Sequence, residues 1–422
     1  MQRHISVNLG NLLLSLSEIT DLANTEISYH QQRTAFIAVE IATFAGEDES
    51  VIEDIFAASL LHDVGAISIE EKTKLHSITN IHDDTINKEF HCKRGEMLLN
   101  KTPWFKGISK IVRYHHTDYM DFEDTIKDTF VFSSQVIYLA DYVERLVDRS
   151  KYILHQHKEI IDKIKELDDT FVHPDIVNYF LQASEREEFW LDLVSPRLYS
   201  VLLDNGPYRN LDIDINNIIH ISEMYKSVID FKSPYTATHT TGVAACAQSI
   251  SIKFGLTDFE TNLMKIAGHL HDIGKLVIPN SIIEKPGKLT QHEFALMKSH
   301  TYYTHHVINT IGGLERIADW AAYHHEKLDG SGYPFRCKQH EIGIGARIMT
   351  VADIFTAITE DRPYRKGMNK DEVYSVLKQN ISDDKLDKNI VNLLLDNYYN
   401  ISHDVKAKQN EARHFYEDIF LG

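Results

Sequence analysis

The hexapeptide Leu-Leu-His-Asp-Val-Gly occupies residues 60–65, and a similar one, His-Leu-His-Asp-Ile-Gly, occupies residues 269–274. Their His-Asp pairs stand 209 residues apart (271 − 62). A similarity that recurs at one fixed distance is the signature of a duplicated structural unit. If the chain is such a duplication, the same offset should relate further residues outside the two hexapeptides.

The offset does relate a series of His and Asp residues of the metal-ligand type. Without insertion, it pairs His30 with His239, His91 with His300, His115 with His324 and His116 with His325. After three extra residues, Asp141 corresponds to Asp353. This ordered series indicates an internal repeat. It predicts two domains, residues 1–204 and 212–422, joined by a polar Gly-Pro turn at 204–209.

The local pattern is helical in both copies. Apolar residues recur at helical spacing before each His-Asp pair, at 54–61 and 263–270. Thr290 followed by Glu293 forms a capping box, which predicts that a helix begins there. No sustained strand-type alternation was found, so no strand is predicted. The expected fold class is all-α, with two helical bundles in tandem.

Composition narrows the functional classes. The 422 residues are 43% apolar and 25% charged, as in ordinary folded proteins. No run of 18 apolar residues occurs, so no membrane span is expected, and three scattered cysteines favour the cytoplasm. A net charge of −18 without a Lys/Arg run disfavours long nucleic acid as a partner. A small anionic ligand held by metal ions is compatible, and the sequence leaves a homodimer open.

Each copy contains five histidines and two aspartates in the matched series. Histidine is the commonest metal ligand in proteins, and helical bundles build metal sites from ligands on facing helices. Seven ligands exceed the needs of one ion and suit two divalent ions, with Asp272 as the bridge in the second copy. Mixed imidazole and carboxylate ligands favour iron or manganese. The first copy has the residues for a further metal site.

Residues 230–370 resemble the HD-GYP branch of the HD phosphohydrolase superfamily. The resemblance rests on an ordered set of motifs: Tyr-Thr-Ala-Thr-His at 235–239, His-Asp-Ile-Gly-Lys at 271–275, Lys-Pro-Gly-Lys-Leu at 285–289, His-His-Glu at 324–326, Asp-Gly-Ser-Gly-Tyr-Pro at 329–334, and Asp-Arg-Pro-Tyr-Arg at 361–365. It implies hydrolysis of a 3′,5′-cyclic dinucleotide, cyclic di-GMP or 3′3′-cyclic GMP-AMP (cGAMP), to the linear 5′-phosphorylated dinucleotide.

The resemblance also implies residue roles. The metal ligands would be His239, His271, Asp272, His300, His324, His325 and Asp353. Lys275 would stabilise charge on the scissile phosphate, beside Asp272 in the catalytic centre. The substrate would contact Gly330, Tyr333, Pro334, Arg347, Arg362 and Arg365, although Arg347 also suits a structural ion pair.

Two positions depart from the family pattern. Some members have a Glu four residues before the first His, where it helps to hold a third metal, but this chain has Tyr235 there. A dinuclear site is therefore favoured. Members often have a carboxylate three residues after the last Asp ligand, where this chain has Thr356. That change is expected to affect how the site is tuned or which substrate it prefers.

The N-terminal copy resembles a general HD domain. Its ligand set is His30, His62, Asp63, His91, His115, His116 and Asp141. Ala66 replaces the lysine, and Thr-Asp-Tyr-Met-Asp at 117–121 replaces the Gly-Tyr-Pro loop. Two interpretations compete: a degenerate regulatory or dimerising copy, and a second hydrolase, such as a 5′-nucleotidase, with its own metal centre. For the whole chain, the alternative to an enzyme is a cyclic-dinucleotide sensor that binds without turnover.

Overall fold

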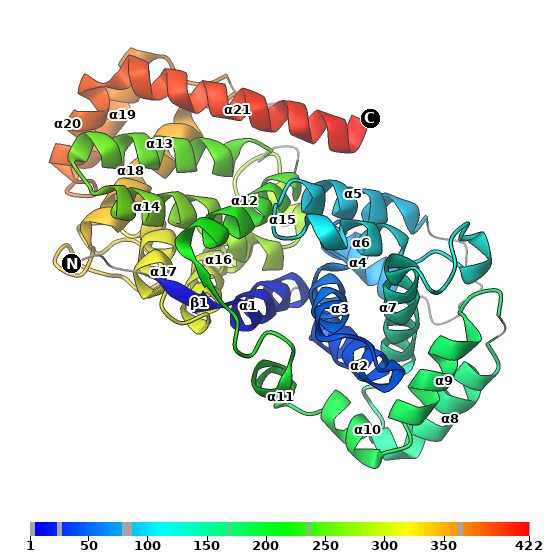
Figure 1. The fold of residues 1–422 in the computed structure, drawn as a ribbon. Helices are drawn as coiled ribbons and strands as arrows, with labels where there is room; N and C mark the ends of the chain where they lie inside the picture. Colours follow the sequence, from blue (N-terminus) through cyan, green and yellow to red (C-terminus); the bar gives the residue numbers. More distant parts are fainter. Residues whose placement is uncertain are drawn as a thin grey trace. The chain divides into compact units, whose positions relative to one another are not determined.

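The computed structural model describes residues 5–22, 28–77, 87–167, 169–233, 237–361 and 366–421. These residues are predominantly helical (Figure 1), which confirms the predicted all-α fold class. The chain divides into two compact units, Asn8–Asp212 and Met1–Val7 with Ile213–Gly422, called here the N-terminal and the C-terminal unit. The division falls after the Gly-Pro turn, and the first seven residues belong to the C-terminal unit.

Two short strands, β1 (Ser6–Asn8) and β2 (Asp212–Asp214), pair in a two-stranded sheet. No strand is predicted from the sequence here, because three residues are too few to establish an alternating pattern. Each strand leads directly into a helix whose N-terminus it caps. The Asn8 side chain accepts a hydrogen bond from the Asn11 amide, and Asp214 accepts one from the Asn217 amide.

In the N-terminal unit, helix α2 packs against α3, α7 and α9 (Figure 1). Most apolar side chains of α2, including Phe36, Ile37 and Ile41, are buried in the core, as are Phe56, Leu60 and Leu61 before the His-Asp pair. The α-helices and 3₁₀ helices (η) of this unit are α1 (Leu9–Asp21), α2 (His30–Ala45), α3 (Glu49–Leu61), α4 (Ile69–His76), α5 (Glu89–Asn100), η1 (Lys106–Ile108), α6 (Ser109–Tyr114), η2 (Tyr119–Asp121), α7 (Thr129–Leu146), α8 (Ile153–Lys165), α9 (Pro174–Ala183), α10 (Glu187–Leu193) and α11 (Leu198–Asn205).

In the C-terminal unit, helix α13 takes the place of α2 and packs against α14, α18 and α21 (Figure 1). The capping box predicted at Thr290 and Glu293 is present at the start of α16. The helices of this unit are α12 (Ile215–Phe231), α13 (His239–Phe254), α14 (Asp258–Leu270), η3 (Ile273–Val277), α15 (Asn280–Ile283), α16 (Gln291–Thr310), α17 (Glu315–Ala322), η4 (Tyr323–His325), α18 (Ile344–Thr359), α19 (Lys370–Ser382), α20 (Lys388–Asp396) and α21 (Tyr398–Leu421).

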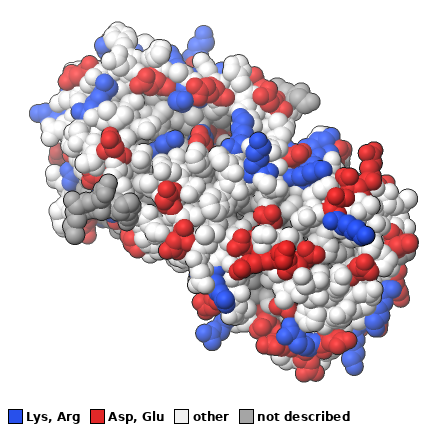
Figure 2. Space-filling view, viewed as in Figure 1, with Lys and Arg blue, Asp and Glu red and all other residues white. Residues whose placement is uncertain are grey.

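The molecular surface carries both signs of charge. On the face drawn in Figure 2, Lys and Arg are interspersed with Asp and Glu, and the described residues there form no continuous basic stripe. No helix within the described ranges is both long and apolar enough to span a lipid bilayer.

The glycine two residues after each His-Asp pair lets two ligand-bearing segments approach closely. A Cβ on Gly274 would lie 1.9 Å from the carbonyl oxygen of His300, and a Cβ on Gly65 would lie 2.0 Å from that of His91. Only a residue without a side chain fits there. The contact sets the position of the third histidine relative to the His-Asp pair in each unit.

We expect Gly274→Ala and Gly65→Ala each to lower the free energy of unfolding by about 1–3 kcal/mol, because the added methyl group overpacks against backbone that cannot move away. Gly107→Ala is the control, since a Cβ there meets nothing within 4 Å, and it should change stability by less than about 0.5 kcal/mol. Denaturant unfolding measures all three. Equal stability of Gly274→Ala and Gly107→Ala would contradict the close approach.

Candidate functional site

The seven predicted residues of the C-terminal unit come together from five separate segments. His239 begins α13, His271 and Asp272 follow α14, and His300 lies in α16. His324 and His325 lie in η4, and Asp353 lies in α18. All are buried except His325, which is partly exposed. The helical bundle therefore directs residues up to 114 positions apart (353 − 239) toward one point.

Asp272 stands at the centre of this cluster. Its Oδ2 lies 3.3 Å from His271 Nε2, whereas its Oδ1 lies 3.5 Å from His300 Nε2 and 3.8 Å from His324 Nε2. Each carboxylate oxygen thus faces a different set of imidazoles. A carboxylate in this position can bridge two cations.

Asp353 is a second carboxylate in the cluster, and it faces the two histidines that Asp272 does not contact. Its Oδ1 lies 3.2 Å from His239 Nε2, and its Oδ2 lies 3.8 Å from His325 Nδ1. His239 and His325 therefore approach the cluster on the two oxygens of a second carboxylate. His300, His324 and His325 also place one nitrogen each within 4.8 Å of one another, a spacing that suits one metal ion.

Backbone carbonyls fix the orientation of three of the imidazoles. Nδ1 of His271 donates to the Gly268 carbonyl at 2.9 Å, and Nδ1 of His324 donates to the Ala321 carbonyl at 2.6 Å. His300 makes the same contact with the carbonyl three residues before it, at 2.5 Å. A carbonyl only accepts, so the proton is on Nδ1, and Nε2 faces the cluster with its lone pair.

The donor set fits divalent metal ions. His271 Nε2 and Asp272 Oδ1 are buried and have no hydrogen-bond partner among the described residues. Buried polar atoms normally have a partner, so an ion is the simplest group to satisfy these two. Burial, with neighbouring cationic side chains, lowers the pKa of His300 to about 4 and that of His324 to about 3. Both are neutral near pH 7, the form that ligates metals.

Glu360 is a site residue that the sequence analysis missed. Its Oε2 lies 3.4 Å from His239 Nδ1, and its Oε1 accepts hydrogen bonds from Thr238 Oγ1 at 2.5 Å and Gln409 Nε2 at 3.0 Å. In the N-terminal unit, Glu144 holds His30 Nδ1 at 2.6 Å.

Glu144 aligns with Thr356, where the sequence analysis noted a lost carboxylate. In the C-terminal unit a carboxylate is found one helical turn after Thr356, at Glu360. Glu360 lies seven residues after Asp353, and residues seven apart lie on the same face of a helix. Burial alone lowers the pKa of His239, but Asp353 and Glu360 outweigh burial and raise it to about 10. Without metal, His239 is therefore protonated between two carboxylates, and metal binding must release that proton.

Lys275 and the Gly-Tyr-Pro loop, which the sequence analysis predicted to contact the substrate, lie next to the cluster. Lys275 Nζ lies 2.5 Å from Asp272 Oδ2, and its side chain is partly exposed. The Tyr333 ring packs 4.9 Å from the His325 ring, and Pro334 follows it through a cis peptide bond. Gly330 has a φ of 80°, which favours glycine.

The loop is held by Glu326, a second residue that the sequence analysis missed. Its buried carboxylate accepts hydrogen bonds from the amides of Phe335, Arg336 and Cys337 at 2.7–3.0 Å. A Cβ on Gly332 would lie 2.4 Å from Glu326 Cα, so the loop folds back directly over this residue. The signal in the sequence is the acidic residue immediately after the His-His pair.

Of the predicted arginine contacts, the structure describes Arg347, whose guanidinium has its partners elsewhere. Arg347 donates to Asp387 at 2.9 Å and to the carbonyls of Ile342 and Gln339 at 2.8 and 2.5 Å. These contacts match the structural ion pair that the sequence analysis named as the alternative. Arg362 and Arg365 lie outside the described residues, as does Tyr235.

The N-terminal unit builds a similar cluster from its own seven residues. Asp63 Oδ2 lies 3.7 Å from His62 Nε2, and its Oδ1 lies 3.5 Å from His91 Nε2. Asp141 Oδ1 lies 3.4 Å from His30 Nε2, and His62 and His30 approach to 3.2 Å. His115 Nε2 lies 3.3 Å from that of His91, and His116 Nδ1 lies 4.0 Å from Asp141 Oδ2.

The two clusters differ in the cationic or imidazole side chain that lies beside the central aspartate. Where Lys275 approaches Asp272 in the C-terminal unit, His76 Nε2 lies 3.1 Å from Asp63 Oδ2 in the N-terminal unit. His76 was missed because its partner at the fixed offset is Lys285, which pairs with Glu293. The lysine position itself is Ala66. The His76 imidazole reaches the cluster from the end of α4, whereas Lys275 follows its own His-Asp pair by three residues.

We expect Glu360→Gln to weaken metal binding by the C-terminal unit about 10–100-fold, because the outer partner of a ligating histidine sets its orientation and basicity. Metal content at limiting Mn²⁺, measured by mass spectrometry of the intact protein, checks this. The control is Glu411→Gln, which removes an exposed partner of Lys408 on α21. If both variants retain the same metal affinity, Asp353 alone orients His239.

The HD domain family matches two segments of the chain, residues 27–146 and residues 223–390. Three curated relatives are informative. The 3′3′-cGAMP-specific phosphodiesterase 1 of Vibrio cholerae is 27% identical over 94% of each chain. The 3′3′-cGAMP-specific phosphodiesterase 3 of the same organism is 32% identical over 59% of this chain and 56% of its own length. A cyclic di-GMP phosphodiesterase of Pseudomonas aeruginosa is 39% identical over 33% of this chain and 34% of its own.

The fold has a counterpart among solved structures. The crystal structure of a cyclic GMP-AMP specific phosphodiesterase of V. cholerae superposes with a TM-score of 0.62. The match covers 97% of this chain and 98% of the other at 21% sequence identity. At this level of identity the match supports a shared fold. Each of the two segments that match the HD family contains one of the His-Asp clusters. The chain therefore carries two HD domains in tandem and is homologous to phosphodiesterases of the HD-GYP type.

Proposed function

We propose that the C-terminal unit hydrolyses a 3′,5′-cyclic dinucleotide to the linear 5′-phosphorylated dinucleotide at a dinuclear metal centre. The observation that carries this function is the placement of Asp272, whose two carboxylate oxygens face different imidazoles while Lys275 lies against one of them. A sensor without turnover has no need of that lysine. The homology to HD-GYP phosphodiesterases supports the same conclusion.

The first metal ion would be held by His239, His271 and Asp353, and the second by His300, His324 and His325, with Asp272 shared between them. Imidazole and carboxylate ligands together favour iron or manganese. When bound, the two ions supply positive charge that activates water near neutral pH and neutralises the reacting phosphate.

The chain's own residues position and stabilise the reacting group. The Lys275 ammonium, partly exposed beside Asp272, is placed to neutralise charge that develops on the nonbridging phosphate oxygens. Tyr333 and the loop held by Glu326 form a wall next to His325. In the reaction, water forms a bond to phosphorus, the bond from phosphorus to the 3′ oxygen breaks, and the 3′ oxygen leaves with a proton. The phosphate stays on the 5′ oxygen.

We favour 3′3′-cGAMP as the substrate. The relative that matches over 94% of both chains is named for 3′3′-cGAMP, whereas the P. aeruginosa cyclic di-GMP phosphodiesterase matches over 33% of this chain. The three cysteines are free and buried, which fits a chain that acts in the cytoplasm.

Incubation with 3′3′-cGAMP, cyclic di-GMP and cyclic di-AMP side by side, with Mn²⁺ or reduced iron, tests this proposal. We expect 3′3′-cGAMP to be linearised fastest, and Lys275→Gln to lower kcat about 10²–10³-fold because it removes a preorganised charge. Lys285→Gln, which breaks only the ion pair with Glu293, is the control. Binding of all three messengers without any linear product would instead establish a sensor.

For the N-terminal unit we propose a 5′-nucleotidase that removes the terminal phosphate from the linear product. The observation in favour is that all seven ligand-type residues, which a degenerate copy has no physical need to bury, converge on Asp63 and Asp141 as their counterparts converge on Asp272 and Asp353. This copy has no Gly-Tyr-Pro loop in its sequence, and we therefore do not assign cleavage of the cyclic substrate to it.

Chemically prepared linear 5′-phosphorylated dinucleotide separates the two units. We expect Asp63→Ala to abolish phosphate release from this compound and to leave linearisation of the cyclic dinucleotide unchanged. Asp272→Ala should give the reverse, because each variant removes the central carboxylate of one cluster. Chromatography of the products measures both steps. Phosphate release that depends on Asp272 alone would contradict the N-terminal nucleotidase.

A further inference from the structure

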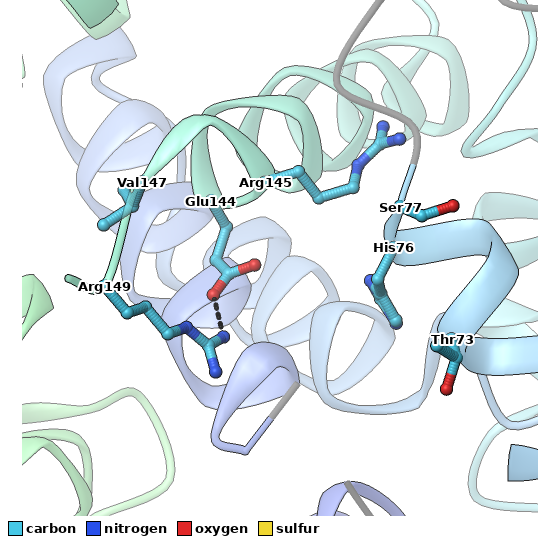
Figure 3. Close-up of a pocket in the computed structure, with 7 residues that line it drawn as sticks. All are labelled: Thr73, His76, Ser77, Glu144, Arg145, Val147 and Arg149. Atoms are coloured by element: carbon cyan, nitrogen blue, oxygen red, sulfur yellow. Dashed lines mark hydrogen bonds and ion pairs between the residues drawn. The ribbon is translucent and has the colours of Figure 1, made fainter. Parts of the chain in front are cut away.

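His76 is an imidazole of the N-terminal cluster that lies outside the duplicated series of His and Asp residues. It ends α4 and lies across a small cavity from Glu144 of α7 (Figure 3). Its side chain is 8% exposed, and neither of its ring nitrogens has a hydrogen-bond partner among the described residues. Buried polar atoms normally have a partner, so this imidazole has a bonding capacity that the described groups around it do not use.

The side chains that His76 contacts are themselves ligand-type residues. Its Nε2 lies 3.1 Å from Asp63 Oδ2, and its ring centroid lies 3.9 Å from that of His30. His30, Asp63 and His76 each place one ligand atom within 4.8 Å of the other two, as do His30, His62 and Asp141. His76 is therefore aimed at the part of the cluster that surrounds His30.

The spacing of these atoms matches that of ligands around one ion. Metal–nitrogen and metal–oxygen bonds of about 2.0–2.2 Å place neighbouring ligand atoms about 2.8–3.6 Å apart in octahedral to tetrahedral geometry. Besides the 3.1 Å between His76 and Asp63, His30 Nε2 lies 3.2 Å from His62 Nε2 and 3.4 Å from Asp141 Oδ1. Pairwise distances of this size are those expected of five donors that share one ion.

An imidazole in this position can ligate a metal, whereas the lysine beside the other cluster cannot. The Lys275 ammonium has only N–H donors, but a neutral imidazole also offers a lone pair. The Lys275 side chain is also more open, at 19% exposure against 8% for His76. Lys275 is thus placed to meet a substrate beside Asp272, and His76 is enclosed with the ligands.

The C-terminal unit has a different residue at the position that matches His76 in the sequence. Lys285 stands there, and its Nζ pairs with Glu293 at 2.5 Å. The first ion of the C-terminal centre would therefore have two imidazoles, from His239 and His271, where the N-terminal ion would have three. A site richer in imidazole favours iron or zinc over manganese.

We propose that His76 is a metal ligand of the N-terminal centre, which binds through Nε2, beside Asp63, the ion that His30, His62 and Asp141 hold. The inference rests on the metal centre proposed above for this unit, and it adds a ligand that neither the duplication nor the HD-domain match assigns. Its consequence is that the two centres of one chain differ in their ligands and in the metal that each prefers.

Titration of Co²⁺ into the metal-free full chain tests the proposal, followed by visible absorption, which depends on the number and kind of ligands. Asp272→Ala is present in every variant to weaken the C-terminal centre, and the binding that Asp63→Ala removes identifies the N-terminal centre. We expect His76→Gln to weaken that binding about tenfold or more and to change the spectrum, because loss of even an outer partner of a ligand lowers metal affinity about 10–100-fold. His76→Lys should lose as much, since an ammonium cannot ligate. His155→Gln is the matched control, an exposed histidine of the same unit.

Unfolding of each variant is measured in parallel, and His76→Asp, which restores a ligand, should recover part of the affinity that His76→Gln loses. A folded His76→Gln with the parent's spectrum and an affinity within about twofold of the parent's would overturn the proposal, as would full affinity in His76→Lys. If Asp63→Ala removes no binding, the N-terminal metal centre fails, and this ligand fails with it. If binding depends on His76 but no phosphate is released from the linear 5′-phosphorylated dinucleotide, the ligand stands and the nucleotidase function fails.

Discussion

A buried carboxylate between imidazoles is the interaction on which each unit depends. Asp272 and Asp63 are almost completely buried, and a buried charge is costly unless it is paired. Burial raises the pKa of Asp272, but Lys275 and the surrounding histidines outweigh it and hold the pKa well below its usual range. The carboxylate therefore stays ionised, and the helices around it are arranged so that imidazole nitrogens, and by our proposal metal ions, surround it.

That arrangement requires close packing of backbone, not only the right ligands. The glycine after each His-Asp pair lies against the backbone carbonyl of the third histidine. The helix that carries this histidine can approach so closely only because the glycine has no side chain. The carbonyls that accept from Nδ1 then turn each ring toward the carboxylate. Helix packing and imidazole orientation are thus parts of one constraint.

The two copies satisfy the same constraint with different outer residues. Glu144 orients His30 directly, whereas in the C-terminal unit Thr356 occupies that position and Glu360 approaches His239 from one turn later. Similarly, Lys275 approaches Asp272 from within the His-Asp motif, and His76 approaches Asp63 from the end of another helix. The seven central residues occupy matching sequence positions in the two copies, whereas the residues that contact them from outside occupy different positions. This pattern is consistent with a duplicated scaffold whose halves act on different phosphate groups.

The sequence by itself determined the all-α class and the duplication, and it predicted the two sets of seven ligand-type residues, because residues such as His239 and His325 keep their spacing in both copies. It assigned no role to Glu360, Glu326 or His76, because none of them belongs to the series of His and Asp residues that recurs in both copies. Nor could it decide between a substrate contact and an ion pair for Arg347, whose partner Asp387 is 40 residues away. Only the tertiary structure decided these, because it alone shows which side chains the folded helices bring within contact distance.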